Sequence, residues 1–337
     1  MYSLFRPLLF KLDPETAHAL TLQLIRLGHY QPLAAVLRAV YAAPERPVEA
    51  FGLKFKNPVG LAAGYDKDGL AFRGLAALGF GHIEVGTVTP RPQPGNPRPR
   101  VFRLAEDRAV INRMGFPGRG AAYVARQLVG RRPSSVVLGV NLGKNKDTPL
   151  EEAAADYVSL IRRFMPLADY LAINVSSPNT VGLRRLQGRE LLESLLKEIA
   201  RERETIRAGR GGHKPVLVKL APDLSDEELD DALDAILRTG MDGVIATNTT
   251  LGRAGLRSDR REETGGLSGE PLRVRSEAVL RRLVKLLDGR LPVVSAGGIM
   301  GPEDAKTRLE AGAALVQVYT GLVYAGPGLV QQILTDM

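Results

Sequence analysis

Residues 171–180 read Leu-Ala-Ile-Asn-Val-Ser-Ser-Pro-Asn-Thr, an apolar run that passes directly into a polar loop. The run 171–175 is too short for a typical helix and too apolar for an exposed loop. It therefore predicts a strand that is covered on both faces. Asn174 lies near the end of this strand, and further hydroxyl and amide side chains follow around Pro178. Taken alone, the polar part is typical either of a simple turn or of a functional loop.

The same pattern of short apolar runs separated by helical patterns continues from residue 50 to the end of the chain. Strands are predicted near 58–63, 82–87, 136–141, 170–175, 215–220, 243–247, 292–296 and 314–319. Eight alternating strand and helix units predict a closed (β/α)8 barrel, or TIM barrel, which one domain of this length can form. We therefore expect a single barrel domain over residues 47–337.

Three helix starts within this domain carry recognisable capping patterns. Ser225 with Glu228 is typical of a capping box, and Gly301 followed by Pro302 predicts another start. Thr148 with Glu151, separated by a proline, predicts a third.

Residues 1–46 form a separate region with helical patterns and no predicted strand. Asp13 can cap a helix that ends at Gly28, and a second helix is predicted from Pro32. This two-helix extension is either a small cap packed on the barrel or a pair of interfacial helices that lie on a bilayer. Basic residues surround the pair: Arg6, Lys11, Arg26 and Arg38.

Composition excludes several classes of protein. The 337 residues include no cysteine, which rules out disulfides, thiolate metal sites and a cysteine nucleophile. The four histidines show no metal-ligand spacing, so we expect no metal. The net charge of +9 is spread over many segments without interleaved aromatic residues, which argues against nucleic acid as a partner. We find neither an apolar run near the ~20 residues of a membrane span nor a signal peptide.

Two connections between predicted strands are long enough to carry function. The connection 88–116 contains two short apolar runs, 101–104 and 109–112, that predict a hairpin over the mouth of the barrel. The connection 249–270 is rich in arginine and glycine and predicts a mobile lid.

The predicted strands end in polar residues, and in a TIM barrel these ends form the active site. The strand-end residues are Thr87, Asn141, Asn174, Lys219, Thr247 with Asn248, and Tyr319 with Thr320. Together they indicate a polar ring around a bound planar molecule. Glycines after the seventh strand, and the helix start after the eighth, are typical of a phosphate site. Neither a G-x-G-x-x-G motif nor a P-loop is present.

Two lysines in this predicted site have more than one interpretation. Lys67 follows the first strand, and Lys219 lies inside the fifth. A lysine at such a position is either a Schiff-base nucleophile or a fixed positive charge beside an anionic ligand. Four asparagines near the same mouth predict a site for an imide-like ring: Asn112, Asn174, Asn179 and Asn248. Ser176 and Ser177 are the obvious proton acceptors, and a serine base requires an acidic carbon or a strong electron sink.

Together these stretches resemble the class 2 dihydroorotate dehydrogenases, which are flavoproteins of pyrimidine biosynthesis that are membrane-associated and quinone-dependent. The most specific are Gly-Leu-Ala-Ala-Gly-Tyr-Asp-Lys-Asp-Gly at 60–69, Gly-Thr-Val-Thr-Pro-Arg-Pro-Gln-Pro-Gly-Asn at 86–96, Ile-Asn-Arg-Met-Gly-Phe at 111–116, Asn-Leu-Gly-Lys-Asn-Lys at 141–146, Asn-Val-Ser-Ser-Pro-Asn-Thr at 174–180 and Ile-Ala-Thr-Asn-Thr-Thr at 245–250.

The resemblance implies a TIM barrel with one FMN at its mouth and Ser177 as the base that removes a proton from dihydroorotate. It implies these substrate-binding residues: Lys67, Asn112, Arg113, Met114, Gly115, Phe116, Asn174, Asn179, Asn248 and Thr249. The implied FMN contacts are Ala63, Gly64, Lys67, Thr87, Asn141, Asn174, Lys219, Thr247, Gly269, Gly298, Tyr319 and Thr320.

Class 2 is favoured because the soluble relatives use a cysteine base, and this chain has none. The resemblance then implies a membrane quinone as acceptor, with His18, Arg103 and Tyr319 in the quinone tunnel. It implies a peripheral protein at the cytoplasmic face of the cell membrane, in contact with anionic lipid. The alternatives from the residues alone are a barrel lyase or aldolase with a Schiff base on Lys219, and a non-catalytic basic binding protein.

Overall fold

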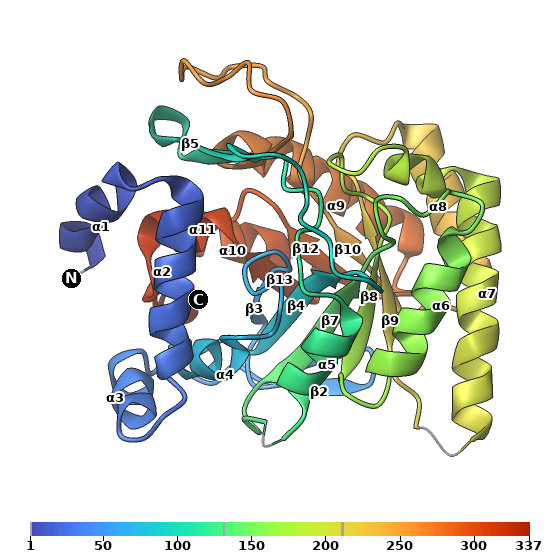
Figure 1. Ribbon diagram of the computed structural model, residues 1–337, viewed down its shortest axis with the longest axis horizontal. Coiled ribbons are helices and arrows are strands. Elements are labelled where there is room, and N and C mark those ends of the chain that lie inside the picture. Colours follow the sequence, from blue (N-terminus) through green and yellow to red (C-terminus); the bar gives the residue numbers. More distant parts are fainter. Residues whose placement is uncertain (1, 131, 210–211) are drawn as a thin grey trace.

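The computed structural model describes residues 2–130, 132–209 and 212–337. Eight parallel strands close into a barrel (Figure 1) in the order β3, β4, β7, β8, β9, β10, β12 and β13. Their bounds are Val59–Leu61, His82–Val88, Val137–Leu142, Tyr170–Asn174, Val216–Leu220, Gly243–Ala246, Val293–Ala296 and Leu315–Val318. The eight predicted strands and the TIM barrel are confirmed.

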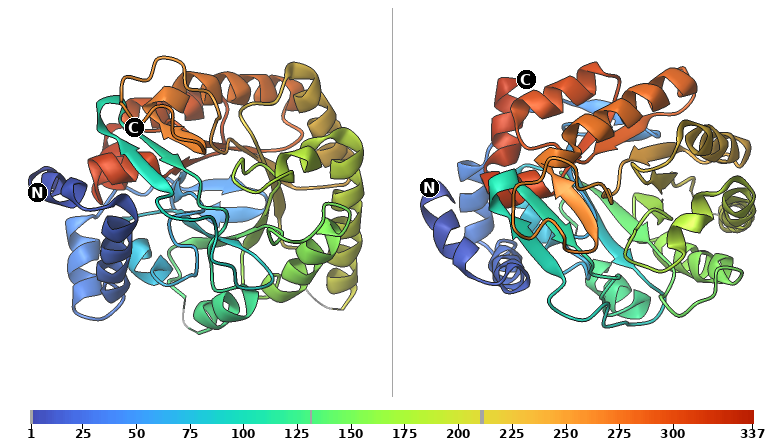
Figure 2. Two further views of the ribbon diagram at one scale, coloured as in Figure 1. Left: turned by 45° about the horizontal axis from the view of Figure 1, so that its top comes forward. Right: turned by 90° about the horizontal axis from the view of Figure 1, so that it is seen from above.

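Helices surround the strands on all sides when the barrel is seen from above (Figure 2). They are α4 (Phe72–Leu75), α5 (Ala121–Leu128), α6 (Ala153–Phe164), α7 (Arg189–Ala208), α8 (Asp226–Arg238), α9 (Arg273–Leu287), α10 (Pro302–Glu310), α11 (Thr320–Ala325) and α12 (Leu329–Asp336). Four short 3-10 helices are η1 (Ala76–Leu78), η2 (Ala105–Asp107), η3 (Leu183–Gln187) and η4 (Glu270–Leu272). The main apolar core lies between the strands and this ring of helices.

A second apolar cluster fills the amino-terminal half of the barrel interior. Phe55, Leu217 and Ile245 belong to it, and each is almost fully buried. The hairpin of β1 (Val48–Ala50) and β2 (Leu53–Phe55) contributes to the same cluster. Because this half of the interior is packed with side chains, a ligand site can form only toward the carboxyl ends of the strands.

The predicted helix starts are confirmed in two of three places. Ser225 and Glu228 form the reciprocal capping box of α8, and α10 begins at Pro302 after Gly301. The prediction at Thr148 is wrong, because α6 begins only at Ala153. The Thr148 hydroxyl instead donates a hydrogen bond at 2.8 Å to the buried carboxylate of Asp156, which lies within α6. It therefore does not cap the start of that helix.

The amino-terminal extension contains three helices, one more than the sequence predicted. They are α1 (Tyr2–Lys11), α2 (Pro14–Leu27) and α3 (Leu33–Val40), and they lie beside the barrel next to α4 and α11 (Figure 1). Asp13 caps α2 as predicted. The additional helix is α1, which was not predicted and carries Pro7 in its interior, where proline is usually unfavourable. Within the described residues, no helix is both long and apolar enough to cross a membrane.

A small sheet lies over the carboxyl ends of the barrel strands. The predicted hairpin is present as β5 (Val101–Leu104) and β6 (Ala109–Asn112), and β11 (Gly266–Gly269) pairs with β6. The end of the predicted lid is therefore part of this sheet. The remainder of that connection projects above the barrel as the long orange loop in Figure 1.

Candidate active site

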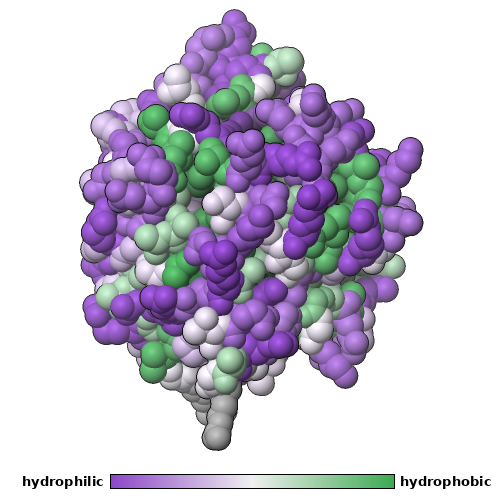
Figure 3. Space-filling model, turned by 90° about the vertical axis from the view of Figure 1, so that its right-hand side faces the viewer, coloured by the Kyte–Doolittle hydropathy of each residue, from purple (hydrophilic) through white to green (hydrophobic). Residues whose placement is uncertain are grey.

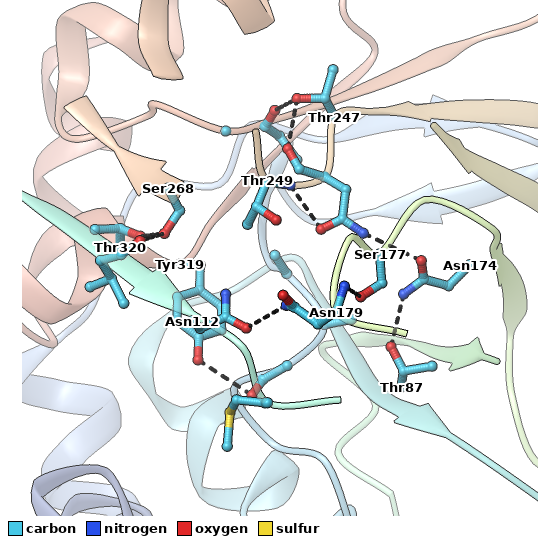
Figure 4. Close-up of a pocket in the computed structure, with 18 of the residues that line it drawn as sticks. Thr87, Asn112, Asn174, Ser177, Asn179, Thr247, Thr249, Ser268, Tyr319 and Thr320 are labelled. Atoms are coloured by element: carbon cyan, nitrogen blue, oxygen red, sulfur yellow. Dashed lines mark hydrogen bonds between the residues drawn. The ribbon is translucent and has the colours of Figure 1, made fainter. Parts of the chain in front are cut away.

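The carboxyl ends of the strands and the small sheet enclose a cavity that contains most of the predicted site residues (Figure 4). The predicted residues that line it are Ala63, Gly64, Lys67, Thr87, Asn112, Met114, Gly115, Phe116, Asn174, Ser177, Asn179, Lys219, Thr247, Asn248, Thr249, Gly269, Gly298, Tyr319 and Thr320. They come from both ends of the sequence, so the fold brings together residues that lie far apart along the chain.

Two predicted residues do not line this cavity. The Arg113 guanidinium pairs with Glu263 at 2.6 Å and stacks on the Phe102 ring, so it contacts the projecting loop. Asn141 is fully buried beneath the cavity, where its Oδ1 accepts a hydrogen bond from the Thr87 hydroxyl at 2.6 Å. Asn141 can therefore act on a ligand only through its neighbours.

Ser177 lies in the loop after β8 and is only 5% exposed. Its Oγ accepts a long hydrogen bond from the Asn179 backbone N–H at 3.3 Å. Arg184 secures the same loop by donating from Nε to the Ser176 carbonyl at 3.0 Å and from Nη2 to the Thr249 carbonyl at 2.7 Å. One guanidinium thus links the serine loop to the polar segment after β10.

Four amide side chains converge on the cavity from three segments, namely the end of β6, the stretch 174–180 and the residues after β10. The Asn179 amide donates to Asn112 Oδ1 at 3.1 Å, and the Asn248 amide donates to Ser176 Oγ at 3.0 Å. Asn174 Nδ2 donates to Thr87 Oγ1 at 2.9 Å. These contacts fix the orientation of the amides, so the cavity offers donors and acceptors at fixed positions. A planar ring with several N–H and C=O groups is the class of ligand that such a lining matches.

Two lysines supply positive charge to the cavity. Lys67 Nζ donates to the Gly64 carbonyl at 2.6 Å, and burial lowers the pKa of the Lys67 ammonium to about 8. Lys219 is 5% exposed, and its Nζ lies 3.9 Å from a carboxylate oxygen of Glu84. Burial lowers the pKa of Lys219, and the negative charge of Glu84 opposes that shift. Both ammonium groups are suited to an anionic ligand.

One end of the cavity is built from glycines and hydroxyls. Gly298 has a φ of +73°, and a Cβ on it would lie 2.3 Å from the Arg273 Cα. Only glycine fits there. The Ser268 and Thr320 hydroxyls lie 2.8 Å apart nearby. Exposed backbone and hydroxyl groups of this kind match a phosphate, as the sequence predicted for this end of the site.

Sequence reasoning missed some cavity residues and one residue beneath the cavity. Ser268 and Gln317 line the cavity, and Gly297, one of the glycines predicted after the seventh strand, lines it as well. Glu84 is fully buried below it. A signal existed for Glu84 and Gln317, because each is a polar residue inside an apolar strand, like Lys219.

A second cavity of about 490 Å³ lies between the extension and the barrel. His18, Arg103 and Tyr319 all line it, so the fold brings the three predicted tunnel residues together. It shares five lining residues with the first cavity: Lys67, Val101, Val110, Met114 and Tyr319. Its remaining lining is mainly apolar and comes largely from α1, α2 and α3.

Two polar side chains of the second cavity, His18 and Arg103, have a defined charge or defined hydrogen-bond partners. Burial lowers the pKa of the His18 imidazole to about 3, and the nearby charge of Lys67 acts in the same direction. His18 is therefore neutral near pH 7. Its ring meets the Tyr65 ring edge-on at 4.9 Å. Arg103 donates to the Leu9 carbonyl at 3.0 Å and also to the Leu12 carbonyl, which ties β5 to α1.

The described part of the chain contains no group of three His, Cys, Asp or Glu side chains that could hold a metal ion.

Comparisons with known proteins agree with this geometry. The family model for dihydroorotate dehydrogenase matches residues 47–337. Proteins named dihydroorotate dehydrogenase (quinone) from Roseiflexus sp. (strain RS-1) and Acidithiobacillus ferrooxidans are each 52% identical to this chain. The matches cover 99% and 100% of this chain and 92% and 94% of those proteins. A crystal structure of DHODH from Eimeria tenella in complex with ferulenol has a TM-score of 0.88 at 41% identity, covering 96% of this chain and 90% of that one. The chain belongs to the dihydroorotate dehydrogenase family.

Proposed function

We propose that this protein oxidises dihydroorotate to orotate in pyrimidine biosynthesis, with FMN as its flavin and a membrane quinone as electron acceptor. The observation that carries the proposal is the arrangement of the two cavities. A buried serine, four asparagines and two lysines line one cavity, and a mainly apolar cavity shares a wall with it. The family membership supports the same activity, as do the relatives from Roseiflexus and Acidithiobacillus, which are dihydroorotate dehydrogenases (quinone).

The family is flavin-dependent, and the residues present fit FMN. Buried polar atoms without a partner remain at the cavity, namely Gln317 Oε1 and Thr249 Oγ1. Lys219 is placed to balance negative charge on a ring, and the absence of a Cβ at Gly298 leaves room for a phosphate. FMN, when bound, supplies the hydride acceptor. The residues that would hold it are Ala63, Gly64, Thr87, Lys219, Thr247, Gly269, Gly298, Tyr319 and Thr320.

The asparagines and Lys67 orient the substrate. Dihydroorotate carries imide N–H and C=O groups, which the amides of Asn112, Asn174, Asn179 and Asn248 can pair with. The ammonium of Lys67 attracts its carboxylate. Ser177 Oγ takes the proton from one ring carbon, while the hydride leaves the adjacent carbon and a C=C bond forms between them. The low exposure of Ser177 excludes bulk water from that proton transfer.

The amino-terminal extension provides the entrance for the quinone. Eleven of the sixteen exposed large apolar side chains in the described residues lie between Leu4 and Val40. The side of the barrel covered by α7 and α8 is by contrast mostly hydrophilic, with apolar side chains in small separate groups (Figure 3). We place the extension on a membrane, at its cytoplasmic face, with the basic residues of the extension near anionic lipid headgroups. The protein would then be peripheral.

The position of Lys219 favours the charge-balancing role over a Schiff base, because its ammonium lies beside the Glu84 carboxylate. The membership of the chain in a dehydrogenase family also speaks for the redox reaction.

The first prediction concerns flavin reduction and the base. The purified protein is expected to be yellow and to bleach when dihydroorotate is added anaerobically. Ser177→Ala should bind FMN normally and bleach about 10²–10⁴-fold more slowly, because a general base contributes that much. Stopped-flow absorbance measures both rates. Ser177→Cys is the matched variant and should retain part of the rate. A colourless protein that also fails to take up added FMN would refute the proposed function, and fast bleaching of Ser177→Ala would remove Ser177 from its role.

The second prediction concerns pH. The pKa of Lys67 is lowered to about 8, so its charged form is present below that pH and is lost as pH rises through it. The dissociation constant of the anionic product orotate should therefore increase above pH 8, by at most about tenfold per pH unit. Fluorescence titration of the flavoprotein between about pH 6 and pH 9.5 measures it. Lys67→Met should bind more weakly with a flat profile, and a flat profile in the unaltered protein would contradict this role.

The third prediction concerns the membrane. Leu4 and Leu8 on α1 are 75% and 62% exposed, and burying each in a bilayer contributes roughly 2 kcal/mol. Leu4→Asp with Leu8→Asp should weaken binding to anionic liposomes by at least about tenfold and leave reduction by dihydroorotate unchanged. Val129→Asp is the matched control, since Val129 is 62% exposed and lies outside the extension. Unaltered liposome sedimentation of the double variant would show that the extension is only a cap.

A further inference from the structure

Glu84 is a fully buried carboxylate in the middle of β4, below the first cavity and outside its lining. It accepts three hydrogen bonds: from Asn141 Nδ2 at 2.8 Å, Tyr170 Oη at 3.0 Å and Gln317 Nε2 at 3.0 Å. The Lys219 ammonium is its nearest positive charge, at 3.9 Å. A buried charge is costly unless it is hydrogen-bonded and paired with an opposite charge. Here the three donors and the ammonium come from four other strands.

The carboxylate decides which way the Asn141 amide points. An ionised carboxylate only accepts hydrogen bonds, so the NH₂ group of Asn141 must face Glu84. Asn141 Oδ1 then faces upward and accepts from Thr87 Oγ1 at 2.6 Å and from Asn174 Nδ2 at 3.1 Å. Thr87 and Asn174 both line the cavity. The orientation set at Glu84 is therefore transmitted to two residues that contact a ligand.

The same constraint applies to Gln317. Its NH₂ group is held by Glu84, which leaves the carbonyl oxygen Oε1 buried and without a partner. Gln317 lines the cavity and is 1% exposed. A buried acceptor left unpaired is unfavourable, so this oxygen is suited to an N–H donor on a bound ring.

We propose that Glu84 is a positioning residue for the flavin site. It turns the Asn141 and Gln317 amides so that both present oxygen toward the cavity side, and it places one negative charge beneath Lys219. Gln317 Oε1 then accepts a hydrogen bond from an imide N–H of the flavin ring. This inference rests on the proposed function, because it requires that the cavity holds a flavin.

The charge arrangement predicts an effect on the reduction potential. Reduction adds electrons to the ring, and a nearby negative charge opposes that gain while a positive charge favours it. Glu84 and Lys219 together are close to neutral. Removal of the Glu84 charge leaves the Lys219 ammonium unbalanced, so the flavin should become easier to reduce.

The test uses Glu84→Gln in the full chain. Its FMN dissociation constant, measured by the recovery of free-flavin fluorescence, should increase by about tenfold or more, because one oriented ligand contact is lost. Its midpoint potential at pH 6, measured by anaerobic titration against a reference dye, should be higher than in the unaltered protein. The difference should shrink as pH rises, because Lys219 without its partner loses its proton more readily.

A second variant keeps the inference testable if Glu84→Gln does not fold. Tyr170 lies outside both cavities, and its hydroxyl donates to Glu84 at 3.0 Å. Tyr170→Phe therefore leaves the carboxylate with one donor fewer, and the midpoint potential should move in the opposite direction, to a lower value. Glu202→Gln is the control. Glu202 is a buried carboxylate on α7 that pairs with Arg162 of α6 at 2.7 Å and lies outside both cavities. The FMN affinity and the midpoint potential of this variant should match those of the unaltered protein.

The outcomes separate this inference from the proposed function. An unaltered protein that binds no FMN defeats the proposed function. An unaltered protein that binds FMN, together with unchanged potentials in Glu84→Gln and Tyr170→Phe, defeats the role of Glu84 alone. A weaker affinity of Glu84→Gln without any change in potential would be a structural effect and also overturns the inference.

Discussion

A closed parallel barrel has an interior that side chains must fill, and this constraint decides where chemistry can occur. In the amino-terminal half the interior is apolar, with Phe55, Leu217 and Ile245 packed against each other. Glu84 marks the level at which the interior becomes polar, because three other barrel strands supply its hydrogen-bond donors and a fourth supplies the ammonium of Lys219. The cavity is therefore a consequence of how the barrel interior is filled.

The two cavities give the two substrates of the proposed reaction separate routes. Dihydroorotate is polar and can reach the polar cavity from the mouth of the barrel, beneath the sheet of β5, β6 and β11. A quinone is apolar and can enter between the helices of the extension. Lys67, Met114 and Tyr319 belong to both linings, so the ring of a flavin in the first cavity would lie close to the second.

The sequence predicted the eight barrel strands and most of the polar strand ends that line the cavity, because strand ends in a TIM barrel meet at one side whatever their distance along the chain. The family resemblance supplied further lining residues, such as Met114 and Phe116. It predicted less well where one side chain decides the local structure. Thr148 has the pattern of a cap, yet Asp156 uses its hydroxyl. Arg113 has a place in a cavity motif, yet Glu263 draws its guanidinium outward. Glu84 was missed, although it interrupts its strand in the same way that Lys219 does, and only the closed barrel shows that the two face each other.

Some of the basic residues behind the net charge of +9 stabilise the fold, which composition alone does not reveal. Arg100 is 7% exposed and pairs with Glu15 of α2 at 2.7 Å, while Arg103 holds α1 through two carbonyls. Both arginines come from the segment around β5, so charged contacts fix the extension to the sheet over the cavity. The Tyr2 hydroxyl adds a bond to the Val323 carbonyl at 2.6 Å. These polar contacts face the barrel, while apolar side chains such as Leu4, Leu8 and Val36 are exposed on the extension, which is the arrangement that membrane docking requires.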